Sequence, residues 1–219
     1  MAAMSFKEFG QKILYGMFDP LVWIIRKFGL TPNNITTIGF LINIIAGIYL
    51  VAPFFLDTAI SVKRLVGFGI IVLFSGLMDV LDGRMARVFQ LKSTYGAFYD
   101  SVMDRYSELI MFLGLIAYFI IENKWVLIFI VFCCLSGSLM VSYTRARAEG
   151  LNVKCSVGLL QRPERILLIT LSCIVAGIIG GAQSDIVLII GLGIVAILAN
   201  FTAFQRIAHA KKQMNQLPH

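Results

Sequence analysis

Long apolar runs alternate with short polar stretches along most of the chain. A helix that crosses the hydrocarbon layer of a membrane needs about 20 mostly apolar residues, so 219 residues leave room for six such helices and short loops. The runs predict an all-α integral membrane protein with six transmembrane helices. Their approximate bounds are 30–51, 66–87, 95–121, 125–143, 166–179 and 186–204.

The N-terminal residues have a different pattern, in which apolar side chains recur at helical spacing and charged side chains occupy the other side until Pro20 interrupts the pattern. This periodicity predicts an amphipathic helix that lies in the membrane interface, and it also fits a helix packed on the cytosolic surface of the protein. We therefore divide a single domain, 1–219, into an interfacial segment, 1–29, and a six-helix bundle, 30–212. The apolar residues of the amphipathic pattern are Phe6, Phe9, Ile13, Leu14 and Met17.

Composition and charge agree with a membrane protein. Hydrophobic residues make up 58% of the chain, and the net charge is +7. The lysines and arginines gather in the N-terminal segment, in alternate connections between the apolar runs and at the C-terminus. Because cytoplasmic loops carry the excess of these residues, both termini are predicted to be cytoplasmic, and no nucleic-acid partner is indicated.

Four aspartates stand at the ends of two apolar runs, between residues 79 and 104. Asp79 and Asp82 are three residues apart, and Asp100 and Asp104 are four apart, so each pair lies on one face of a helix. Placing one ionised carboxylate inside a bilayer costs about 2.5 to 3.5 kcal/mol. Four carboxylates in such a position are therefore best explained by a bound cation that balances their charge. Oxygen ligands of this kind suit Mg²⁺ or Mn²⁺. The alternative is a salt-bridge cluster without a ligand, neutralised by Arg84, Arg87 and Arg105.

Glu108 lies one helical turn after Asp104. Its position fits two interpretations. It is either an auxiliary acid beside the aspartates or an ion-pair partner of Arg105 within the same helix.

The spacing of the acidic segment resembles the signature of the CDP-alcohol phosphotransferase family. Eight positions carry this resemblance: Asp79, Asp82, Gly83, Ala86, Arg87, Gly96, Asp100 and Asp104. Pro32, Asn33 and Thr36 are similar to the element that opens the first transmembrane helix of the family. Pro32 also suits a first helical turn on its own account.

The resemblance implies a reaction and a set of roles. Asp79, Asp82, Asp100 and Asp104 would hold Mg²⁺ or Mn²⁺, with two ions expected, and Asp104 would also take the proton of the acceptor hydroxyl. The donor would be a CDP-lipid such as CDP-diacylglycerol, and CMP would leave. A homodimer in a prokaryotic cell membrane is implied as well, and the distribution of lysines and arginines places the aspartates, and so the active site, at the cytoplasmic face. The residues expected to contact the CDP-lipid are Pro32, Asn33, Thr36, Asp79, Asp82, Gly83, Ala86, Arg87 and Gly96.

Arginines suggest the acceptor. Arg145, Arg162 and Arg206 lie in or near segments that resemble the bacterial phosphatidylinositol-phosphate synthases and their archaeal ether-lipid counterparts, in which a lysine is common at the position of Arg145. A guanidinium group suits a phosphate dianion, so these residues are expected to bind inositol phosphate. The alternative is that they only set the topology or bind lipid headgroups.

Two other functions stay open from the sequence. The first is the same transfer to glycerol 3-phosphate or another alcohol. The second is transport of a divalent cation, which is disfavoured because the acids stand at helix ends and no repeat is evident.

Overall fold

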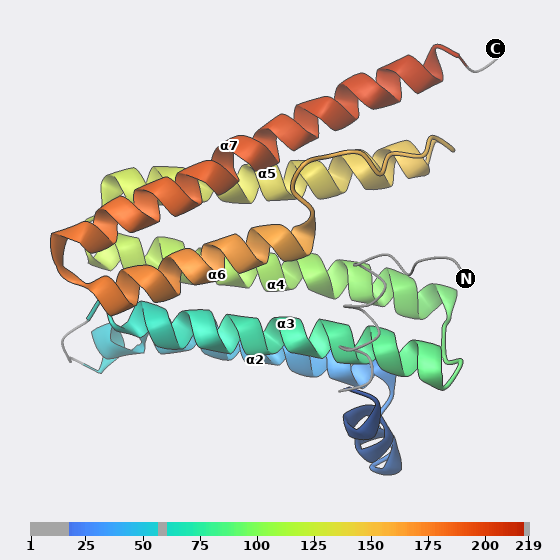
Figure 1. Ribbon diagram of the computed structural model, residues 1–219, viewed down its shortest axis with the longest axis horizontal. Coiled ribbons are helices and arrows are strands. Elements are labelled where there is room, and N and C mark those ends of the chain that lie inside the picture. The colour runs from blue at the N-terminus through green and yellow to red at the C-terminus, as the bar shows by residue number, and fades with distance from the viewer. Residues whose placement is uncertain (1–17, 57–60, 217–219) are drawn as a thin grey trace, which may run out of the picture. The chain divides into compact units, whose positions relative to one another are not determined.

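The computed structural model describes residues 18–56 and 61–216, and within them every regular element is a helix (Figure 1). The all-α prediction is therefore confirmed. Most of the predicted amphipathic helix lies outside the described residues. Its described part is helical over residues 18–27 and continues through Pro20, where an interruption was predicted. The helices that follow are α2 (Pro32–Phe55), α3 (Arg64–Val88), α4 (Thr94–Ile121), α5 (Trp125–Glu149), α6 (Arg162–Ile179) and α7 (Gly181–Met214).

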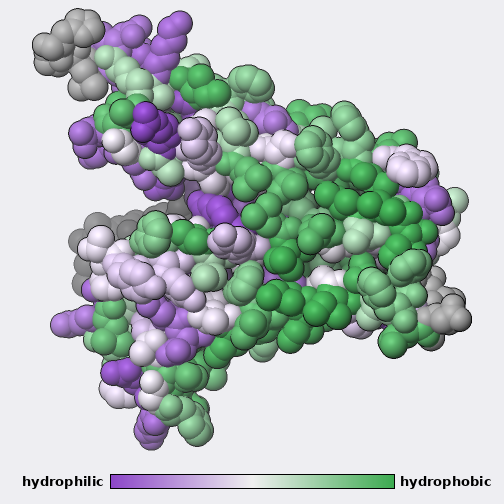
Figure 2. All heavy atoms as spheres, turned by 180° about the vertical axis from the view of Figure 1, so that it is seen from behind, coloured by the Kyte–Doolittle hydropathy of each residue, from purple (hydrophilic) through white to green (hydrophobic). Residues whose placement is uncertain are grey.

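Among the described helices, α2, α3, α5 and α7 are long and apolar enough to cross a membrane. Helices α4 and α6 are mainly apolar but carry several charged residues in their first halves. Many large apolar side chains point outward, including Phe129, which is 69% exposed, and Ile197, which is 71% exposed. Figure 2 shows such residues gathered over a large part of the visible face. Surfaces of this kind are stable against lipid rather than water.

The start of α2 is determined by local interactions. Thr31 precedes the helix, and its Oγ1 accepts a hydrogen bond of 3.3 Å from the Asn34 backbone N–H. In return, the Asn34 side-chain Oδ1 accepts a hydrogen bond of 2.8 Å from the Thr31 backbone N–H. Pro32 occupies the first helical position, where a missing N–H costs nothing. The predicted start of this helix is confirmed.

The chain forms two compact units, and α2, α3 and α4 each contribute to both. Of the described residues, the first unit contains 18–42 and 74–107, and the second contains 43–56, 61–73 and 108–216. The aspartates therefore belong to the first unit, and the predicted acceptor arginines belong to the second.

The second unit has the larger core, in which side chains from all six helices pack together. Helix α7 lies beside α5 and also packs on α6 (Figure 1). Small residues allow close approach of the backbones. A Cβ atom placed on Gly114 of α4 would lie 2.9 Å from Gly47 Cα of α2, so α4 does not tolerate a larger side chain at this contact.

The first unit has a small apolar core that includes side chains from the aspartate-bearing end of α3. Val22 of the segment 18–27, Ile35 of α2, and Leu81 and Met85 of α3 are all buried there. This core joins the end of α3 to two segments that precede it by more than 40 residues. It fixes the part of α3 that carries Asp79 and Asp82.

Candidate active site

The last turns of α3 present four signature residues on one face. At 100° per residue, Asp79, Asp82, Gly83 and Ala86 fall within a narrow arc of the helix. The predicted spacing is therefore realised in an unbroken helix. Asp100 and Asp104 lie one turn apart near the start of α4, in the same unit.

Asp82 is buried, with 6% of its surface exposed, and a threonine orients it. Thr36 Oγ1 donates a hydrogen bond of 2.5 Å to Asp82 Oδ2. Thr36 is itself only 4% exposed. The element at the start of α2 is thus connected directly to the acidic signature, a link that the sequence did not reveal.

The glycines of the signature have different surroundings. A Cβ atom on Gly96 would lie 3.4 Å from Asn33 Oδ1 and 3.0 Å from Ser93 Oγ, which places Asn33 close to the start of α4. A Cβ atom on Gly83 would meet nothing within 4 Å. Packing within the protein therefore does not explain Gly83. Open space beside Asp82 instead suits the close approach of a ligand.

The aspartates have the chemistry of a site for a hard cation. Asp79 and Asp100 lie near enough to Asp82 for their negative charges to act on its carboxylate. Asp104 Oδ2 is 3.5 Å from Arg105 Nη1, which is a long ion pair. Within residues 18–56 and 61–216, however, no three acidic, histidine or cysteine side chains are grouped tightly enough to enclose an ion. Because like charges repel, a bound cation would stabilise the aspartates when they lie close together. The oxygen donors fit Mg²⁺ or Mn²⁺.

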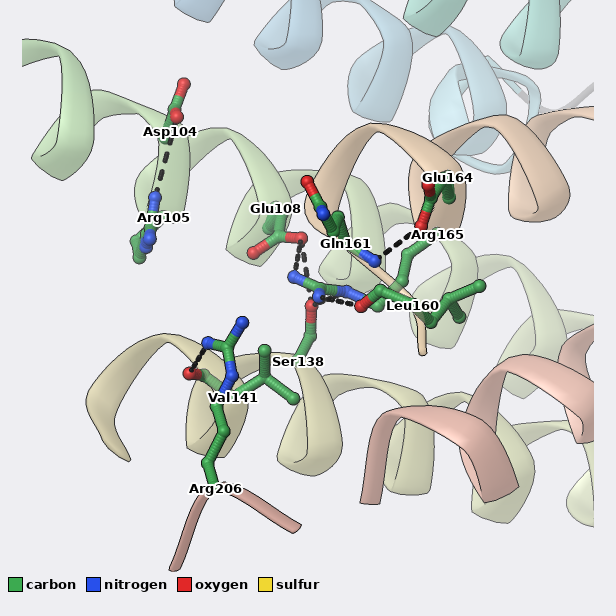
Figure 3. A network of polar contacts seen from close by, with 10 residues as sticks. All are labelled: Asp104, Arg105, Glu108, Ser138, Val141, Leu160, Gln161, Glu164, Arg165 and Arg206. Carbon is green, nitrogen blue, oxygen red and sulfur yellow. Dashed lines mark hydrogen bonds and ion pairs between the residues drawn. The ribbon is translucent and has the colours of Figure 1, made fainter. Parts of the chain in front are cut away.

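The predicted acceptor arginines make different contacts in the second unit. Arg145 Nε donates to Glu149 Oε1 at 2.8 Å on the exposed side of α5. Arg162 is the first residue of α6. Arg206 is only 5% exposed, and its Nε donates to the Val157 carbonyl. Its Nη1 donates to the Val141 carbonyl (Figure 3). It therefore has a structural role whether or not it also binds an anion.

Arg206 also lines a cavity of about 360 Å³ between the C-terminal parts of α5 and α7. Arg147 and Lys211 line the same cavity, and its remaining wall is mainly apolar. Three cationic side chains around one cavity favour an anionic occupant.

Glu108 is not the partner of Arg105, so that interpretation of the sequence is wrong. Glu108 Oε1 lies 3.2 Å from Arg165 Nη2 of α6, and Ser138 of α5 bonds to both side chains (Figure 3). Arg105 instead pairs with Asp104. Glu108 and Arg165 are 2% and 1% exposed, so Arg165 belongs to a buried ion pair rather than to an exposed cationic group. The separation of 57 residues explains why helical spacing did not predict this pair.

We expect Arg165→Ala to lower the free energy of unfolding by about 3 to 5 kcal/mol, because it leaves the Glu108 carboxylate buried without its cation. Thermal unfolding of the purified protein in detergent measures this loss. Lys212→Ala, which removes an exposed cation near the end of α7, is the control and leaves the unfolding temperature unchanged. Equal stability of the two variants would contradict a stabilising role for the pair.

Known proteins with the same sequence pattern and fold support this description. The family model for CDP-alcohol phosphatidyltransferases matches residues 29–208. The archaetidylinositol phosphate synthase of Pyrococcus horikoshii is 34% identical over 191 residues, which cover 87% of this chain and 88% of that protein.

Two crystal structures of the phosphatidylinositol phosphate synthase of Mycobacterium tuberculosis have the same fold. The structure with CDP-DAG bound has a TM-score of 0.75 and 27% identity, and the match covers 88% of this chain and 92% of that one. The structure in complex with manganese and citrate has a TM-score of 0.77 and 26% identity, with 88% of each chain covered. Both the matched residues and the helical arrangement around the acidic signature lead to one conclusion: the chain belongs to the CDP-alcohol phosphatidyltransferase family.

Proposed function

We propose that this protein transfers the phosphatidyl group of a CDP-diacylglycerol-type lipid to a hydroxyl group of inositol phosphate, releasing CMP. The observation that carries the proposal is the acidic signature held by Thr36 at the buried Asp82. The named relatives support the acceptor, because they are synthases of inositol phosphate lipids. A divalent-cation transporter is not supported by family membership.

The aspartates divide the chemistry between them. Asp79, Asp82 and Asp100 would hold Mg²⁺ or Mn²⁺, and Asp104 would contribute both an oxygen ligand and the general base. A cation held by these carboxylates would supply the positive charge that neutralises the diphosphate and the departing CMP. Asp104 accepts the proton of the acceptor hydroxyl as its oxygen bonds to the lipid phosphorus. The bond from that phosphorus to the CMP oxygen breaks in the same transfer.

The donor nucleotide would lie against the starts of α2 and α4 and the end of α3. Gly83 leaves open space there, and Gly96 allows Asn33 to stand close to α4. Arg87 supplies a positive charge one turn after Gly83, suited to a donor phosphate. Three further residues complete the proposed donor site. Pro32 begins α2 and Thr36 orients Asp82. The short side chain of Ala86 leaves room for the donor beside α3.

Four of the described helices are long and apolar enough to span a membrane, and the proposed membrane arrangement adds two more. We infer that α4 and α6 also cross, which gives six spans with both termini in the cytoplasm, and that the N-terminal segment lies in the interface. The active site then faces the cytoplasm of a prokaryotic cell, where a soluble acceptor reaches a lipid donor. We further infer a homodimer.

Release of CMP tests the proposal. The purified protein is incubated with CDP-diacylglycerol, Mg²⁺ or Mn²⁺, and one acceptor at a time: inositol phosphate, inositol, glycerol 3-phosphate or no alcohol. Inositol phosphate is expected to give the fastest release, and removal of the metal with a chelator is expected to stop it. Faster release with glycerol 3-phosphate at equal concentration would mean that glycerol 3-phosphate, and not inositol phosphate, is the acceptor. The transfer reaction of the family would still be supported.

We expect Arg145→Ala and Arg162→Ala to raise the KM for inositol phosphate about 10- to 100-fold, because each removes a charge-assisted contact worth roughly 1.5 to 3 kcal/mol. The KM for the CDP-lipid should hardly change. Lys154→Ala removes an exposed cation from the same connection and serves as the control. Arg206→Ala should have the same effect on KM but should also reduce stability, since two carbonyls lose their donor. An unchanged acceptor KM in all three variants would limit these arginines to structure and topology.

A further inference from the structure

The helical segment 18–27 is packed against the end of α3. Val22 is completely buried among Ile35, Leu81 and Met85. Trp23 makes an edge-to-face contact with Phe89, with ring centroids 4.8 Å apart. The segment is therefore attached by apolar contacts to the part of the first unit that carries the signature.

A bidentate ion pair fixes the orientation of this segment. Arg84 Nε donates to Asp19 Oδ1 at 2.6 Å, and Arg84 Nη2 donates to Asp19 Oδ2 at 2.8 Å. The hydrogen bonds from Arg84 lower the pKa of the Asp19 carboxyl below its ordinary value. Two parallel bonds between planar groups specify direction as well as distance. The pair thus restrains rotation of the α3 end relative to the segment.

The ion pair and the two aspartates lie on nearly opposite sides of α3. By the helical repeat of 100° per residue, Arg84 is about 140° from Asp79 and about 160° from Asp82 around the helix axis. The ion pair therefore attaches the segment 18–27 to the side of α3 that faces away from these two aspartates. Thr36 of α2 restrains Asp82 separately, through its hydrogen bond to the carboxylate.

We propose that Asp19 and Arg84 are positioning residues, which fix the rotation of the α3 end and thereby aim Asp79 and Asp82 at the metal. Neither side chain is assigned a contact with substrate or with a reacting atom. The inference rests on the metal role proposed above for the aspartates. Partners outside the ligand shell of a metal commonly change its affinity about 10- to 100-fold when they are removed.

A double-mutant cycle tests the inference. Affinity for Mn²⁺ is measured by electron paramagnetic resonance on the full chain in detergent without substrate. Asp19→Asn and Arg84→Gln should each weaken binding about 10-fold, and the double variant should be no weaker than either single variant. With saturating Mn²⁺, kcat should fall while the KM for the acceptor stays constant. Lys27→Ala, which removes an exposed charge from the same segment, should change neither quantity.

Charge exchange separates positioning from general destabilisation. Asp19→Arg combined with Arg84→Asp restores an ion pair and should recover most of the Mn²⁺ affinity, whereas each of these reversals alone should not. Additive losses in the cycle, or affinities equal to wild type in both single variants, would overturn the inference while leaving the proposed function intact. Absence of Mn²⁺ binding by the wild-type protein would overturn the proposed metal site and this inference together.

Discussion

Asp100→Asn is expected to abolish CMP release while the protein remains folded. The amide keeps the size of the carboxylate but removes its charge, so a metal ion loses a ligand and the charge that balances it. Loss of such a ligand removes several kcal/mol of transition-state stabilisation, and kcat/KM should fall more than about 100-fold. The negative charge of Asp100 acts on the buried carboxylate of Asp82, so the two aspartates belong to the same acidic cluster.

The measurement is CMP release at saturating CDP-lipid and acceptor, with Mn²⁺ affinity determined in parallel. Asp185→Asn is the matched control, because this aspartate pairs with Lys124 in the second unit and carries no proposed ligand role. Its activity should stay close to wild type. If Asp100→Asn kept more than about a tenth of the wild-type rate, Asp100 would not be a metal ligand. Asp79→Asn should behave as Asp100→Asn does.

Local sequence patterns predicted the helices well but not all of their lengths. Helix α2 begins at Pro32 as expected, because its start depends on neighbouring residues. Helix α5 was predicted to end near residue 143 and continues to Glu149, and α7 extends beyond 186–204 at both ends. Hydropathy marks where a helix can meet lipid, whereas arginine, alanine and glutamine continue a helix into polar surroundings. The ends of α5 and α7 follow from propensity.

The same distinction applies to the candidate site. Spacing placed Asp79 and Asp82 on one face of a helix because that arrangement depends only on the helical repeat. It did not reveal the hydrogen bond from Thr36 to Asp82, whose partners are 46 residues apart, or the ion pair of Asp19 with Arg84, whose partners are 65 apart. Such contacts depend on how helices pack. Their residue types allow several partners, so one sequence does not select among them.

Asp104→Asn should separate proton transfer from metal binding. Asparagine keeps the size of the side chain and an oxygen ligand, but its amide does not accept the proton of the acceptor hydroxyl. If general-base catalysis contributes about 10²- to 10⁴-fold, kcat should fall by that amount. Binding of the CDP-lipid, measured separately at equilibrium, should change much less than it does in Asp100→Asn. The contrast between the two variants distinguishes the roles of their carboxylates.

Arg105→Ala provides the control for Asp104. It removes the long ion pair of 3.5 Å and leaves the Asp104 carboxylate in place, so turnover should change little. A large loss of turnover in Arg105→Ala would mean that the ion pair, and not the basicity of Asp104, limits the reaction. Equal losses of donor binding and turnover in Asp104→Asn would make Asp104 a metal ligand only. The acceptor proton would then have to leave through another group, because bond formation to the lipid phosphorus still requires its removal.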